Sequence, residues 1–172
     1  RRRIAEVQEQ IRKYAPDVKW VAPENLHITL KFLGDVREDD LPNVHAAVGD
    51  AVEGMPRFEM SFGGLGAFPN PARARVVWVG IEDGCEELAR IAARVDANLA
   101  KLGFEKEDRP FRAHVTIGRV KDGKSPGKLA QGIEEIDARE LGSQQVLSVA
   151  VMESELRREG PVYSPLSESK LG

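Results

Sequence analysis

Apolar residues recur every three or four positions in three stretches of the chain, and this spacing is typical of helices that bury one face. The stretches are residues 4–15, 41–53 and 86–102. Each is followed closely by a residue that ends helices, namely Pro16, Gly54 and Gly103. The pattern therefore predicts three amphipathic helices, and a shorter fourth helix is predicted over residues 128–136.

Between the helices, short apolar or alternating stretches indicate strands. Strands are predicted over residues 18–21, 26–33, 57–62, 75–81, 111–120, 146–156 and 162–166. The last two are predicted to form a hairpin, because Gly160-Pro161 lies between them. Residues 63–72 are predicted to be a loop, since glycines and prolines flank Phe68 on both sides, and residues 121–127 are predicted to be a polar turn.

Helices and strands mix along the whole chain, and no linker or low-complexity tract divides it. A helix precedes each of the two strands that carry the motif described next. The sequence therefore predicts one α+β domain over residues 1–172, built of two lobes with mostly antiparallel sheets.

Two of the predicted strands contain the same four-residue pattern. The copies are His27-Ile28-Thr29-Leu30 and His114-Val115-Thr116-Ile117, about half the chain apart. In an extended chain, the His and Thr of each copy share one face and the two apolar residues share the other. The spacing predicts two similar halves, each of which delivers one His-x-Thr pair.

Basic residues lie next to both motifs. Lys31 follows the first motif and should share the face of His27, with Phe32 behind it. The basic residues around the second motif are Arg109, Arg112, Arg119, Lys121 and Lys124. By alternation, Arg112 shares the face of His114, whereas Arg119 lies on the opposite face unless the strand twists or bulges.

The composition is that of an ordinary globular protein, with 41% hydrophobic and 31% charged residues. No apolar run approaches the ~20 residues that span a membrane. A net charge of −3 argues against a protein that coats long duplexes, although a local basic pocket could still hold a short nucleic-acid end. The single cysteine, Cys85, allows no internal disulfide and fits a reducing cytoplasm. We expect a cytoplasmic monomer, with no membrane and no protein partner.

Two imidazoles and two hydroxyls are suited to chemistry at phosphorus. Because the pKa of an unperturbed imidazole is ~6.5, one histidine can accept a proton while another donates one. Each such group typically contributes ~10²–10⁴ in rate. The threonine hydroxyls can donate to the oxygens of a tetrahedral anion, and phosphoryl transfer needs little beyond such positioning.

Other interpretations of these residues remain open. A lone histidine on a strand is more often structural than catalytic, but the two motifs use two of only three histidines, and His45 lies in a helical pattern without a motif around it. Two histidines and a distant carboxylate could bind zinc, which would leave both threonines unexplained. Gly63-Gly64-Leu65-Gly66 lacks the Lys-Ser/Thr ending of a phosphate-binding loop.

Four segments resemble a known family. They are WVAPENLHITLKFLGDV (20–36), RVVWVGI (75–81), RPFRAHVTIGRVK (109–121) and MESELRREGPVYSPL (152–166). Together they resemble the two-histidine (2H) phosphoesterase superfamily, and within it the RNA 2′,3′-cyclic phosphodiesterases, also called LigT-like or 2′-5′ RNA ligases. The resemblance covers almost the entire chain.

This resemblance implies two pseudo-symmetric lobes around a central cleft that both motifs face. It implies hydrolysis of the 2′,3′-cyclic phosphate of an RNA end or a cyclic nucleotide to a 2′-phosphate, without metal or cofactor. By match to the motifs, His27 donates a proton to the leaving 3′-oxygen and His114 accepts one from water, while Thr29 and Thr116 hold the non-bridging oxygens. Two alternatives stay open: 2′-5′ RNA ligation as the main activity, and a module that binds an RNA end without turnover.

Three further residues are candidates for substrate contact. Arg119 and Arg112 can each pair with phosphate or lie on a solvated surface, and Phe68 can stack on a base or pack in the core. The family usually begins with a strand before the first helix, so we expect such a strand to precede Arg1 in the full protein.

Overall fold

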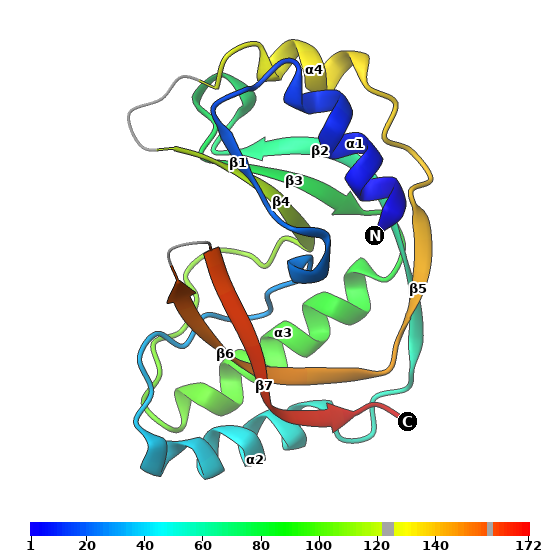
Figure 1. The fold of residues 1–172 in the computed structure, drawn as a ribbon. Coiled ribbons are helices and arrows are strands. Elements are labelled where there is room, and N and C mark those ends of the chain that lie inside the picture. The colour runs from blue at the N-terminus through cyan, green and yellow to red at the C-terminus, as the bar shows by residue number, and fades with distance from the viewer. Residues whose placement is uncertain (122–125, 158–159) are drawn as a thin grey trace. The chain divides into compact units, whose positions relative to one another are not determined.

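The computed structural model describes residues 1–121, 126–157 and 160–172, and these form two compact units (Figure 1). Unit 1 consists of Arg1–Ile28, Met60–Asp83 and Ala113–Gln144, and unit 2 consists of Thr29–Glu59, Gly84–Arg112 and Gln145–Gly172. The predicted two-lobed α+β architecture is confirmed. The units do not coincide with the two halves of the sequence, however, because each is assembled from three separate segments.

A five-stranded sheet contains the strands of unit 1, in the order β1-β4-β3-β2-β5. The strands are β1 (Val18–Trp20), β2 (Phe58–Phe68), β3 (Val76–Ile81), β4 (His114–Val120) and β5 (Gly142–Val146). The pairs β1/β4, β3/β4 and β2/β3 are all antiparallel. The first residues of β2, Phe58 and Glu59, and the last residues of β5, Gln145 and Val146, belong to unit 2.

The prediction of a loop over residues 63–72 is wrong for its first half, because β2 continues to Phe68. Glycine lowers strand propensity, but Gly63 and Gly66 pair with β3, and between them Gly64, with a φ of 77°, accommodates a bulge in the β2–β3 register. Only the short 3-10 helix η3 (Pro71–Arg73) and its flanks remain outside a strand before β3.

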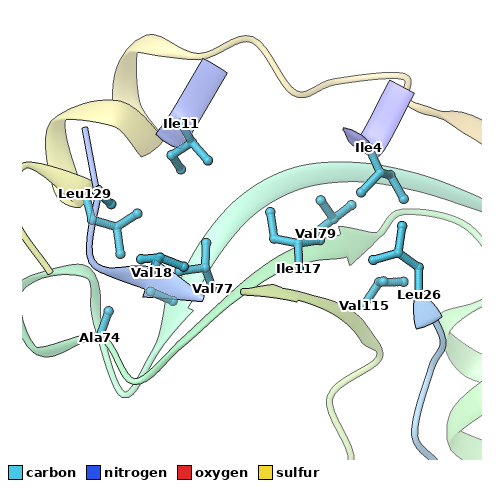
Figure 2. Packing of buried hydrophobic residues seen from close by; sticks show 12 residues of the cluster. Ile4, Ile11, Val18, Leu26, Ala74, Val77, Val79, Val115, Ile117 and Leu129 are labelled. Carbon is cyan, nitrogen blue, oxygen red and sulfur yellow. The ribbon is translucent and has the colours of Figure 1, made fainter. Parts of the chain in front are cut away.

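Two helices cover one face of the unit 1 sheet. Helix α1 (Arg2–Arg12) contributes Ile4 and Ile11, and α4 (Leu129–Glu135) contributes Leu129. These side chains pack on residues from the strands beneath, including Val77, Val79, Val115 and Ile117 (Figure 2). Both helices lie where the sequence predicted them. Apolar residues at helical spacing indicate an amphipathic helix from the local sequence alone, without reference to distant residues.

One buried polar side chain ties α1 to two extended segments. The Gln8 side chain is only 4% exposed, and its Nε2 donates hydrogen bonds of 2.8 Å to the carbonyl oxygens of both Val21 and Ile117. The backbone N–H of Val21 also donates to Ile117 O at 3.0 Å. Gln8 therefore links Val21, the residue directly after β1, to Ile117 in the middle of β4 through its two hydrogen bonds, and we call this link the Gln8 clamp.

Unit 2 contains two helices and a β-hairpin. These are α2 (Leu41–Val52), α3 (Cys85–Ala100), β6 (Ser148–Arg157) and β7 (Gly160–Lys170). Asn98 Nδ2 donates to Ala47 O at 3.1 Å, and Arg94 donates to two carbonyls at the end of α2. The predicted hairpin is confirmed and extends further than the alternation alone indicated.

The predicted strand over residues 26–33 is wrong. The chain there follows the 3-10 helix η1 (Pro23–Asn25), has no strand assignment and leads to η2 (Glu38–Asp40) before α2. It also passes from unit 1 to unit 2 between Ile28 and Thr29. An alternating pattern predicts an extended chain, but a strand requires a neighbouring backbone to pair with.

Two further expectations from the sequence concern membrane-spanning segments and the polar turn over residues 121–127. None of the described helices is long and apolar enough to cross a membrane. Lys124 and most of the predicted polar turn over residues 121–127 lie outside the described residues.

Candidate active site

The second His-x-Thr motif has the predicted alternation. In β4, Val115 and Ile117 are buried at 3% and 0% exposure, whereas His114 and Thr116 are only partly buried. Val115 and Ile117 point to the core under α1, so His114 and Thr116 lie on the opposite face of the sheet (Figure 2). We call this opposite face of unit 1 the histidine face.

A bulge in β4 brings Arg119 to the histidine face. Gly118 pairs with Val77 and Thr116 pairs with Trp78, so Ile117 has no register partner on β3. Beyond this bulge the alternation is reversed, and Arg119 pairs with Val76, which shares the face of Trp78. Strict alternation predicts Arg119 on the core face unless the strand bulges. The structure contains such a bulge, so Arg119 lies on the histidine face.

The register defines three rows across the histidine face. The rows are Gly63–Gly80–His114, Gly66–Trp78–Thr116 and Phe68–Val76–Arg119–Lys19, from β2 through β3 to β4 and, in the last row, β1. One face therefore collects an imidazole, a hydroxyl, two cations and two large aromatic rings. Trp78 and Lys19 were not predicted as site residues, because only the pairing of strands distant in sequence places them beside the motif.

The Trp78 indole lies over the glycine of the neighbouring strand. A Cβ added at Gly66 would fall 2.1 Å from Cζ2 of Trp78, and one added at Gly80 would lie 3.4 Å from Cζ3. The glycines thus leave the space that the indole occupies. Phe68 packs beside it, with ring centroids 5.3 Å apart and planes inclined at 35°.

Both aromatic rings contact the imidazole of His114. The Phe68 ring lies 5.1 Å from it in an edge-to-face arrangement with an interplanar angle of 84°, and the Trp78 ring lies 6.5 Å away at 60°. Phe68 therefore packs on the candidate catalytic histidine itself. This contact agrees both with a Phe68 that stacks on a base and with a Phe68 that packs in the protein interior, the two roles predicted for it.

His27 also belongs to unit 1, and its ring is held by its own turn. Its Nδ1 lies 2.7 Å from the backbone oxygen of Asn25, the last residue of η1. A carbonyl oxygen can only accept, so Nδ1 carries the proton and Nε2 is the nitrogen that exchanges one. The side chain is exposed.

The residue beside each histidine is anchored in the same core. Leu26 directly precedes His27, Val115 directly follows His114, and both belong to the hydrophobic cluster under α1 (Figure 2). Each half of the chain delivers one of the two histidines, as the motif spacing predicted, and both histidines are tied to a single packed unit.

The remaining predicted site residues fall in unit 2. Thr29 is partly buried and Arg112 is exposed. Because β4 begins only at His114, the strand alternation that placed Arg112 beside it does not apply.

The predicted orientation of Lys31 and Phe32 is reversed. The Lys31 side chain is 4% exposed, whereas Phe32 is 74% exposed. Lys31 Nζ donates to Asp96 Oδ1 and to the Glu105 carbonyl, both at 2.6 Å. An ion pair with a residue distant in sequence turns the lysine inward, and the local pattern contains no sign of it.

A zinc site would need a third ligand beside the two histidines. Within residues 1–121, 126–157 and 160–172, no group of three or more His, Cys, Asp or Glu side chains is arranged to hold a metal ion. The side chains of the histidine face offer acid–base groups and hydrogen-bond donors.

An α+β fold that carries one His-x-Thr motif on β4 of its sheet, with the histidine of the other motif tied to the same core, is that of a phosphoesterase of the two-histidine class. The LigT-like phosphoesterase family matches the chain twice, over residues 1–78 and 79–163, and the chain belongs to that family. Each match contains one of the two motifs.

Curated relatives cover nearly the whole chain. A protein of Methanothermobacter thermautotrophicus named RNA 2′,3′-cyclic phosphodiesterase is 39% identical over 168 residues, which are 98% of this chain and 90% of the relative. A protein of the same name from Archaeoglobus fulgidus is 43% identical over 150 residues, covering 87% and 81%.

Solved structures share the fold. A crystal structure of a Thermus thermophilus protein matches with a TM-score of 0.79 at 28% identity, over 98% of this chain and 89% of that one. The crystal structure of Escherichia coli LigT complexed with 3′-AMP matches with a TM-score of 0.73 at 27% identity, over 97% and 92%.

Proposed function

We propose that this protein is an RNA 2′,3′-cyclic phosphodiesterase that opens the cyclic phosphate at an RNA end to a 2′-phosphate. The observation that carries the proposal is the histidine face: His114, Thr116 and Arg119 lie in adjacent rows of one sheet face, and His27 is tied to the same core. The relatives named RNA 2′,3′-cyclic phosphodiesterase support the choice of substrate, and LigT in complex with 3′-AMP supports a nucleotide ligand.

In the proposed reaction, water attacks phosphorus while the bond to the 3′-oxygen breaks. His114 takes the proton of the attacking water, and Nε2 of His27 gives a proton to the departing 3′-oxygen. The hydrogen bond from Nδ1 to Asn25 O keeps the His27 ring oriented with Nε2 as the exchanging nitrogen. After each turnover, solvent returns both imidazoles to their starting states.

The anionic oxygens need donors as charge develops on them. Thr116 supplies a hydroxyl next to His114, and Arg119 supplies a guanidinium one row further along β4. Thr29 supplies the second hydroxyl by match to the first motif, while Arg112 and Phe68 are secondary candidates for contacts to phosphate and base.

The proposal is tested by hydrolysis of a nucleoside 2′,3′-cyclic phosphate in the presence of a chelator. We expect turnover to survive the chelator, to yield the 2′-phosphate, and to fall by about two to four decades in His27→Ala and in His114→Ala. The matched control is His45→Ala, in α2 of unit 2, which should keep wild-type activity.

Other outcomes would identify the alternatives. Loss of turnover with the chelator would point to a metal, and wild-type activity in either histidine variant would refute the acid–base assignment. Binding of the cyclic nucleotide without turnover would indicate a binding module. Joining of RNA ends through 2′-5′ linkages faster than hydrolysis would make ligation the main activity.

A further inference from the structure

We propose that Trp78 is a positioning residue for His114, and that Gly66 is the glycine that lets the indole reach its place. The proposal rests on the proposed function of His114 as the general base. Trp78 itself makes no contact with the reacting atoms in this scheme: it sets the orientation of the imidazole that does.

The first support is the arrangement of three rings. Trp78 lies in the row next to His114, and its ring centroid is 6.5 Å from that of the imidazole. Phe68 contacts both, at 5.3 Å from Trp78 and 5.1 Å from His114. An imidazole bounded by one tilted ring and one edge-to-face ring has few rotamers open to it, because the alternatives collide with an aromatic surface.

The second support is the room made for the indole on β2. The hypothetical Cβ at Gly66 is 2.1 Å from Cζ2, 2.4 Å from Cη2 and 2.7 Å from Cε2 of Trp78. No side chain fits beneath the indole, so residue 66 must be glycine as long as residue 78 lies flat across it. A glycine within a strand lowers its stability, and at position 66 this loss accompanies the placement of the Trp78 indole over the strand.

The third support is an unsatisfied polar atom. Trp78 Nε1 is buried, and no acceptor for it exists among the described residues. A phenylalanine or leucine would fill a purely structural site without burying an unpaired N–H. The chain nevertheless carries the wider ring, which extends toward both Gly66 and His114.

The decisive variant is Gly66→Ala, because its methyl group must displace the indole. Gly80→Ala is less suitable, since its Cβ would lie 2.7 Å from the backbone oxygen of Gly63 and would disturb the sheet itself. The matched control is Gly49→Ala in α2, where the added Cβ meets only Ser169 Oγ at 3.7 Å.

For the folded enzyme, we expect Gly66→Ala to lower kcat by about tenfold to hundredfold while KM stays within about twofold, because misplacing a catalytic group by about 1 Å has effects of this size. Trp78→Leu should match it, Trp78→Phe should recover only part of the loss because its ring is narrower than the indole, and Gly49→Ala should equal wild type. If Trp78 only stabilised the fold, these variants would instead reduce the folded fraction and leave kcat per folded molecule unchanged.

A spectroscopic signature separates this proposal from the proposed function. In a Trp20→Phe background, the remaining tryptophan is Trp78, and a neighbouring imidazolium quenches indole fluorescence. We expect a fluorescence decrease on protonation that is lost in His114→Asn and changed in amplitude in Gly66→Ala. This signal needs no substrate and no turnover.

Unchanged kcat in both folded Gly66→Ala and folded Trp78→Leu would overturn the positioning role, even if His114→Ala is inactive and the proposed function holds. If Gly66→Ala does not fold, Trp78→Leu and Trp78→Phe decide the question by the same comparison. Full activity of His114→Ala would instead remove the proposed function, whatever the fluorescence shows.

Discussion

Lys31 Nζ lies 2.6 Å from Asp96 Oδ1, so the segment that follows the first motif is fastened to helix α3 by a largely buried ion pair. The lysine side chain is 4% exposed and the aspartate side chain 21%. Asp96 Oδ1 also accepts from the backbone N–H of Glu107 at 3.2 Å. One carboxylate therefore holds two separate segments of unit 2 in place.

Asp96→Asn should destabilise the protein at neutral pH by about 1–3 kcal/mol, because it removes the charge that compensates a buried ammonium. The pKa of Asp96 is lowered by the hydrogen bond from Lys31 and the N–H of Glu107, against the opposing effect of burial. A carboxylate whose pKa is lower in the folded state adds stability above its unfolded pKa and loses it as the pH falls through the folded value.

The difference between wild type and Asp96→Asn should therefore shrink as the pH falls below about 4, the ordinary range of an aspartate. Denaturant unfolding at a series of pH values measures it. The control is Asp39→Asn, whose carboxylate pairs with Arg37 on the surface, where both side chains are at least 80% exposed, and it should change little. A constant difference across pH would exclude the ion pair as the cause.

Arg119→Ala should lower kcat/KM for a nucleoside 2′,3′-cyclic phosphate by about tenfold to hundredfold, because a guanidinium donates paired hydrogen bonds to phosphate oxygens. The control is Lys19→Ala. Lys19 pairs with Arg119 in register and is also exposed, but it lies on the strand beyond β4. Equal losses in both variants would indicate general electrostatic attraction in place of a specific contact.

Gln8→Met should reduce the free energy of unfolding by about 1–3 kcal/mol, since methionine is similar in size but cannot donate the two hydrogen bonds to the part-buried Val21 carbonyl and the buried Ile117 carbonyl. Denaturant unfolding of the variant measures this loss. Gln10→Met is the matched control, because Gln10 lies on the same helix with an exposed side chain and should be neutral. A wild-type stability of Gln8→Met would show that the Gln8 clamp is dispensable.

Tyr14 should ionise at higher pH than an ordinary tyrosine. Its hydroxyl donates to Glu135 Oε2 at 2.6 Å, and the carboxylate raises the pKa of Tyr14, since ionisation would break this bond and place two negative charges together. Ultraviolet titration of the phenol in a Tyr163→Phe background isolates Tyr14, because the chain has two tyrosines. Glu135→Gln should move its transition to lower pH, and an unmoved transition would contradict the contact.

The local pattern was sufficient for the elements that depend on near neighbours. Helices α1, α2 and α3 follow from apolar stripes at helical spacing. The outward direction of His114 and Thr116 follows from alternation along β4. The pairing of two His-x-Thr motifs, and with it the choice of phosphate chemistry, was also visible in the residues alone.

The errors arose where a partner distant in the chain decides the outcome. Residues 63–68 form a strand because β3 pairs with them, despite their glycines. Lys31 turns inward because Asp96 lies on α3, which local periodicity does not report. The stretch after His27 has the alternation of a strand but no strand assignment.

The sequence by itself thus determined the helices, the two motifs and the kind of chemistry they support, because these depend on residue type and short-range spacing. Tertiary structure alone decided which side chains share the histidine face. A bulge at Ile117 moves Arg119 to that face, and strand pairing brings Trp78 beside His114 over a glycine of β2. Register is set by hydrogen bonding between strands far apart in the chain, so no local pattern contains it.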